Sequence, residues 1–192
     1  MIDFEPYRRG EKTLPEIAKG LRPADLARLT DEMCDLQLQL ISAVEDEDVV
    51  FTPEDPEAND TFAATPEEVG ISWTLGHVIV HTTASSEEAA ANALNLARGV
   101  EILGRSRSEV PWQSVHTANQ IRARVDESRR MRLAMIQAWP DQPNLDLTYT
   151  AREGTPPRNA IAQFIGGLAH DDSHLEQVRR IVVQAREARE TA

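Results

Sequence analysis

The sequence predicts an all-α protein folded as a four-helix bundle. Four stretches carry apolar residues at steps of three and four, which is typical of amphipathic helices. Strand-like alternation is nearly absent, and the prolines gather between these stretches. At 192 residues the chain fits one domain and can bury a core without metal or disulfide staples. Long amphipathic helices in such a chain favour a bundle.

The chain begins with an irregular arm that leads into the first helix. Residues 1–22 contain two prolines and two glycines, with one short turn expected around 14–21. A helix over about 23–46 follows, because Pro23 suits a first helical turn and the acidic run at 45–48 ends it. Its apolar face is formed by Leu26, Leu29, Met33, Leu36, Leu40 and Val44. We therefore divide the chain into an arm, 1–22, and a helical domain, 23–192.

Three further helices are expected, separated by long connections. Segment 49–70 is rich in prolines and acids and predicts a loop. The second helix starts at Trp73, capped by Ser72 or Thr74, and runs to Gly99 or Gly104. At about 1.5 Å per residue it would be about 45 Å long, the size of a bundle helix.

The second half of the chain follows the same logic. Residues 105–114 form a connection, and the third helix runs from about Val115 to Trp139, where Pro140 stops it. Residues 141–157 form another long loop, with at most a short extended piece at 145–150. The last helix opens after residues 156–157 and runs to about Ala188. The long connections after the first and third helices permit crossovers, so simple up-down topology is not assured.

Composition narrows the function classes. The formal net charge of −12 repels phosphate backbones and anionic lipid surfaces, so neither nucleic acid nor a membrane is expected as a partner. No stretch approaches the ~18–20 apolar residues of a membrane span, and the N-terminus lacks the apolar core of a signal peptide. We expect a cytoplasmic protein.

Cysteine and arginine add little chemistry of their own. Cys34, the one cysteine, excludes an intrachain disulfide, and neighbouring acids would raise its thiol pKa, so we interpret it as a packing residue. Arginines cluster at 122–132 and 179–189 among acids. They fit the solvated faces of helices, or anchors for an anionic small molecule.

Two pairs of histidines predict a metal site. His77 and His81 lie four residues apart in the second helix, as do His170 and His174 in the fourth, and together they are four of the five histidines. Side chains four apart share one helix face, with Cβ atoms about 5–6 Å apart. Two imidazoles so placed can bind one ion at about 2.0–2.1 Å. His116, the fifth, is expected to be an exposed residue near the start of the third helix.

The two histidine segments resemble the DinB-like superfamily, which includes the mycothiol-dependent maleylpyruvate isomerases. The segments are 73–81, WTLGHVIVH, and 170–178, HDDSHLEQV. The similarity spans about 24–187 and implies a DinB/YfiT-like four-helix bundle with long crossover loops. It also implies one divalent metal, commonly zinc or nickel, held by His81, His170 and His174; imidazole ligands suit iron as well. His77, which matches a position that the isomerase branch also fills with histidine, is a further ligand candidate.

The resemblance also implies a function. His170 stands where the isomerase branch has glutamate, which moves the expectation toward the DinB group proper. We expect a metal-dependent transferase or hydrolase acting on a small molecule, with a low-molecular-weight thiol as cosubstrate, in stress or detoxification. Three protein ligands leave a coordination position for water or substrate. No catalytic side chain can be named. The alternative is a non-catalytic metal-binding scaffold, and a homodimer is expected in either case.

Residues beside the histidines are candidates for supporting roles. Outer imidazole N–H groups need acceptors, and Asp171, Asp172 and Glu176 lie close enough in sequence to supply them. Asp171 and Asp172 are consecutive and point about 100° apart on the helix, so at most one of these two can play that part well. Gln177 is either a substrate contact or a helix-surface residue. The three tryptophans stand near helix ends and are expected to seal the bundle: Trp73, Trp112 and Trp139.

Overall fold

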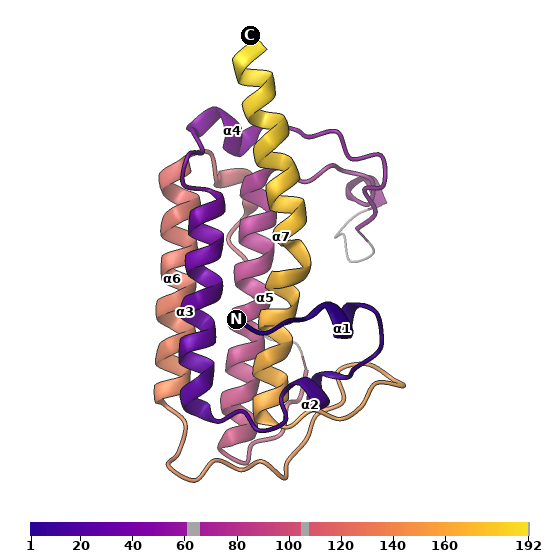
Figure 1. Ribbon diagram of the computed structural model, residues 1–192, viewed down its shortest axis with the longest axis vertical. Coiled ribbons are helices and arrows are strands. Elements are labelled where there is room, and N and C mark those ends of the chain that lie inside the picture. The colour runs from indigo at the N-terminus through magenta and orange to yellow at the C-terminus, as the bar shows by residue number, and fades with distance from the viewer. Residues whose placement is uncertain (61–65, 105–107, 192) are drawn as a thin grey trace.

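The computed structural model describes residues 1–60, 66–104 and 108–191, and it confirms the four-helix bundle (Figure 1). The long helices are α3 (Pro23–Leu40), α5 (Leu75–Ala97), α6 (Ala118–Gln137) and α7 (Ala160–Thr191). The short ones are α1 (Glu5–Arg8), α2 (Leu14–Ile17), α4 (Asp46–Val50), η1 (Pro66–Glu68) and η2 (Trp112–Ser114). No strand occurs in these ranges. Residues 61–65 and 105–107, within two of the predicted connections, lie outside them.

The acidic run at 45–48 does not end the first helix but begins another one. Helix α3 stops at Leu40, six residues earlier than predicted, and Glu45 becomes the N-cap of α4. The Asp48 carboxylate accepts a hydrogen bond from the Glu45 backbone N–H at 2.9 Å. Acidic side chains are favourable at a helix N-terminus, where unpaired N–H groups and the helix dipole attract negative charge. The predicted loop at 49–70 therefore starts with the end of a helix.

The boundaries of α5 resolve two alternatives that the sequence left open. Thr74, not Ser72, is the N-cap, because its hydroxyl accepts from the His77 backbone N–H at 3.3 Å. The helix ends at Ala97, and Gly99 follows with φ +75°. Glycine adopts this left-handed conformation without the penalty that a Cβ imposes. The helix thus ends before both of the predicted C-terminal residues, Gly99 and Gly104.

The four long helices run up, down, down and up. The start of α6 lies beside α4 and the start of α5, since Ala118 N–H donates to Asp46 at 2.8 Å and Val115 approaches Gly76. Helices α5 and α6 are therefore parallel, with Ala97 and Ala118 at opposite ends of the bundle. Each long helix packs on two others, in the order α3, α6, α5, α7 around the bundle. The connections after the first and third helices therefore each join diagonally opposite, antiparallel helices, and the connection after the second joins parallel neighbours (Figure 1).

The last long connection pairs with itself near α7. Tyr149 and Arg158 form an isolated antiparallel bridge, with each N–H donating to the other residue's carbonyl at 2.9 Å. Of the short extended piece expected at 145–150, the structure forms this single bridge at Tyr149. The turn between its two residues is held beside the bundle and reaches the pocket described below.

The arm shares its core with the bundle. Phe4, Leu14 and Ala18 are buried in one hydrophobic cluster with side chains of α3, α5 and α7. Arg8 also forms an ion pair with Asp172 of α7. Residues 1–22 therefore cover one side of α7 (Figure 1).

Helices α5 and α7 approach closely at Gly167. A Cβ built at this position would lie 2.9 Å from Ala89 Cβ and 3.2 Å from Ser86 Cα, both on α5. Such contacts are too short for real side-chain carbons, so only glycine permits this spacing.

We expect Gly167→Ala to lower the free energy of unfolding by about 1–3 kcal/mol, because overpacking must move one helix away from the other. The matched control is Gly166→Ala, one residue earlier. Its new methyl group would meet the tips of the Arg158 and Leu14 side chains, which can move. That variant should be neutral or up to about 1 kcal/mol more stable. Denaturant unfolding measures both, and equal effects would contradict the proposed close approach.

Candidate metal centre

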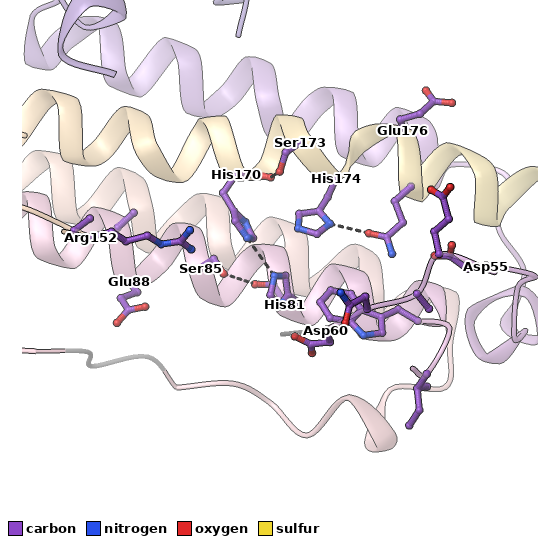
Figure 2. A pocket seen from close by; sticks show the side chains of 18 of the residues that line it. Asp55, Asp60, His81, Ser85, Glu88, Arg152, His170, Ser173, His174 and Glu176 are labelled. Atoms are coloured by element: carbon purple, nitrogen blue, oxygen red, sulfur yellow. Dashed lines mark hydrogen bonds between the residues drawn. The ribbon is translucent and has the colours of Figure 1, made fainter. Parts of the chain in front are cut away.

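Three histidines from two antiparallel helices converge at the middle of the bundle. His81 comes from α5, and His170 and His174 from successive turns of α7 (Figure 2). One ring nitrogen of each lies within 4.8 Å of the others. The ring centroids are 4.7–5.1 Å apart, and His81 Nε2 lies 3.1 Å from His170 Nε2. The structure thus brings together the three residues that the sequence singled out.

The spacing of the nitrogens suits a shared ion. Two imidazole nitrogens bound to one metal at about 2.0–2.1 Å, at angles between octahedral and tetrahedral, lie roughly 2.9–3.4 Å apart. The His81–His170 separation of 3.1 Å falls in this interval. All three side chains are partly buried, with room on one side. The three-histidine cluster could therefore hold a metal ion, and imidazole nitrogen suits zinc, nickel or iron.

The outer side of two rings has a polar neighbour. His174 Nδ1 lies 2.7 Å from Gln177 Oε1, and with Nδ1 as donor, Nε2 keeps its lone pair for an ion. His81 Nδ1 lies 3.9 Å from Glu109 Oε1. Gln177 thus supports a ring from the protein side. Glu109 escaped the sequence analysis because it lies in the long connection after α5, far in sequence from every other site residue.

The acids beside the histidines make their hydrogen bonds elsewhere. Asp172 pairs with Arg8, and Glu176 with Arg179. Asp171 is buried and accepts hydrogen bonds from Arg132 and Ser86. At His174 the outer ring nitrogen therefore contacts Gln177 and not one of these acids, contrary to the expectation.

Asp171 is instead the centre of a buried network that joins all four long helices. Arg132 Nη1 of α6 donates to its carboxylate at 2.8 Å, and Arg132 Nη2 lies 2.8 Å from Cys34 Sγ of α3. Ser86 Oγ of α5 lies 2.7 Å from the carboxylate and 3.0 Å from the Gly167 carbonyl. Burial raises the pKa of Asp171, while Arg132 and Ser86 act in the opposite direction.

The network fixes the register of the histidines. Asp171 directly follows His170, and Ser86 lies little more than one turn after His81. A slide of α5 along α7 would break the Ser86–Asp171 contact and separate the imidazoles together. The ion pair is 1% and 0% exposed at its two side chains, so water does not compete with it.

Cys34 lies in this network and not in a reactive setting. Its side chain is fully buried, and burial is the main reason that the pKa of its thiol is raised. The sequence attributed a raised pKa to flanking acids, but desolvation is the larger cause. The residue acts as the packing group that we predicted.

His77 lies in an aromatic stack beside the cluster. Its ring is 4.4 Å from the ring of Trp73 and 4.5 Å from that of Trp112, with interplanar angles of 23° and 4°. It does not belong to the group of three nitrogens. Trp73 also lies 4.6 Å from His81, so this tryptophan is a wall of the site as well as a seal.

The two remaining aromatic predictions concern residues away from the cluster. Trp139 is buried at the end of α6, in the core cluster that it was expected to seal. His116 is exposed just before α6, and its backbone N–H donates to Gln120. Its predicted position at the surface is confirmed.

A pocket of about 860 Å³ opens over the three histidines. Its floor follows α5 and α7, and its rim is formed by segments 55–60 and 149–152 (Figure 2). Ser85, Ser173 and Gln177 line it near the cluster, and Trp73 closes one side. The histidines are thus reachable by a small molecule.

Fold and site define a class of protein: a helical bundle with a three-histidine cluster that could hold a metal ion. A family model of the DinB superfamily matches residues 8–178, and the chain belongs to that superfamily. No curated protein and no solved structure matches the chain. Across the described ranges, every helix is too short or too polar to cross a membrane.

We expect Asp171→Ala to lower the free energy of unfolding by about 3–5 kcal/mol, because it leaves the Arg132 guanidinium buried without its carboxylate. The double variant Arg132→Met/Asp171→Leu removes both charges and should recover much of this loss. Arg130→Met, on the exposed face of α6, should change stability by less than about 0.5 kcal/mol. Denaturant unfolding compares the variants. A loss of less than about 1 kcal/mol in the free energy of unfolding of Asp171→Ala would contradict a structural role for the Arg132–Asp171 pair.

Proposed function

We propose that this DinB superfamily protein is a metal-dependent enzyme whose ion is held by His81, His170 and His174. The observation that carries this proposal is the 3.1 Å separation of the His81 and His170 Nε2 atoms, with His174 completing the triangle. A three-ligand site at the floor of an open pocket is typical of catalytic centres, whereas structural sites are usually closed by a fourth protein ligand.

The reaction we favour is a transfer to, or hydrolysis of, a small electrophile, with a low-molecular-weight thiol as cosubstrate. A bound divalent ion would supply Lewis acidity and lower the pKa of a water or thiol toward neutrality. The chain's own residues orient the site: Gln177 sets the ring of His174, and Trp73 shields one side from solvent. The placement of the reaction in stress or detoxification rests on the family resemblance.

Two other expectations stay predictions. Zinc, nickel and iron all suit imidazole ligands, so the donor set does not choose the metal. The homodimer and the absence of nucleic-acid and membrane partners rest on the sequence alone.

The metal content of variants should distinguish the proposed ligands from His77. Protein purified without chelator or polyhistidine tag should contain about one equivalent of a divalent transition metal. His170→Ala should lose most of it, because only two of three ligands remain. His77→Ala should keep it, since that ring lies in the tryptophan stack. Elemental analysis measures the content, with the exposed His116→Ala as control, and metal-free wild type under metal-replete conditions would refute the proposal.

Thiol conjugation tests the enzymatic part. Wild-type protein loaded with metal should accelerate the addition of a thiol to a chromogenic electrophile, and His81→Ala should lose at least about 100-fold in kcat/KM. His116→Ala should retain full activity. Equal rates for wild type and His81→Ala would instead favour the non-catalytic scaffold, provided that both proteins are folded by circular dichroism.

A further inference from the structure

The pocket continues well beyond the histidines along the groove between α5 and α7. On α5 the residues that line it lie on one helix face: His81, Ser85, Glu88, Ala89 and Asn92. On α7 it extends from His174 back to Gln163. Gln163 and His170 are seven positions apart, or about 10.5 Å along the helix. We call the part lined by Glu88, Asn92, Tyr149, Arg152 and Gln163 the distal lobe.

Two carboxamides lie deep in the distal lobe. Asn92 and Gln163 are each 7% exposed, although both line the pocket. Gln163 Oε1 is buried and has no hydrogen-bond partner among the described residues. A buried polar group without a partner costs roughly 1–3 kcal/mol, and a ligand that supplies the missing bond regains it. A carboxamide pair matches the donors and acceptors of an amide group.

Charged side chains of both signs stand at the mouth of the lobe. Arg152 lies in the turn closed by the Tyr149–Arg158 bridge, and Thr155 Oγ1 donates to its carbonyl at 2.6 Å. Figure 2 shows the Arg152 side chain extending toward Ser85 and His170, and Glu88 lines the same part of the pocket from α5. A guanidinium binds a carboxylate, and a carboxylate binds an ammonium group.

We propose that the distal lobe binds the peptide-like part of the substrate or cosubstrate, an amide-bearing zwitterion. The Gln163 and Asn92 amides bind its amide group, Arg152 its carboxylate and Glu88 its ammonium group. The reactive group of the ligand then faces the histidines. A chain of three residues spans at most about 10–11 Å, which equals the distance along α7 from His170 to Gln163. This inference rests on the proposed function and names the class of its ligand: a small peptide.

The probe is S-methylglutathione, a tripeptide with amides, carboxylates and an ammonium group but no free thiol. Isothermal titration should detect saturable binding with similar Kd to metal-free and zinc-loaded protein, because the thioether is a poor zinc ligand. Gln163→Leu and Arg152→Gln should each weaken binding about ten-fold, the loss expected for one good hydrogen bond or charge pair. Arg130→Gln, on the far side of the bundle, should leave the Kd unchanged, and 2-(methylthio)ethanol should not bind.

The outcomes separate the two proposals. No binding of the tripeptide, or binding that neither Gln163→Leu nor Arg152→Gln weakens, overturns the distal lobe as a peptide site. Arg152→Gln is informative even if Gln163→Leu fails to fold, because residue 152 is exposed. Wild type that binds the tripeptide but takes up none of zinc, nickel and iron supports the lobe and overturns the metal centre. Zinc uptake without tripeptide binding does the reverse.

Discussion

The buried contact of Asp171 with Arg132 and Ser86 is the interaction on which the site depends. A charge pair in a dry interior is costly to form and still more costly to break, so it tolerates few alternative arrangements of the helices around it. Here it links α5, α6 and α7, while Cys34 brings in α3. The close approach at Gly167 lies beside this contact and sets the distance between α5 and α7. The Ser86–Asp171 contact sets the position of α5 along α7. Together these two contacts bring imidazoles of α5 and α7 close to one another. The imidazoles themselves are not needed to hold the two helices in place.

Much of this arrangement follows from periodicity. Histidines four apart share one helix face in any α-helix, and the apolar stripes predict which faces turn inward, so an inward-facing pair on each helix could be expected from spacing. The choice of His81 over His77 as the partner of His170 and His174 came from the family resemblance. The positions of helix ends were less accessible. An acidic run reads equally well as the end of one helix or the start of the next, and only the return of the Asp48 side chain to Glu45 decides between them.

Other parts of the site could not be predicted because they depend on topology. Glu109 lies near His81, and Trp112 stacks on His77, only because the segment before α6 lies beside the first half of α5. No local pattern encodes that placement. Arg132 looks like one of several arginines on a charged helix, and its burial is visible only when the helix is placed against Asp171. The amide side chains of the distal lobe are likewise ordinary helix residues until the neighbouring segments enclose them.

The parallel course of α5 and α6 has a consequence for how the protein folds. Helices joined by short turns can dock in pairs as soon as they form, but α6 can dock beside α5 only after the chain has travelled the length of the bundle. The most important contact, α5 with α7, joins segments about ninety residues apart in the chain, as with His81 and His170. High contact order of this kind slows folding relative to a simple up-down bundle. Since α7 supplies two of the three imidazoles, the cluster assembles late, and an ion present during folding would meet complete coordination only in the nearly native chain.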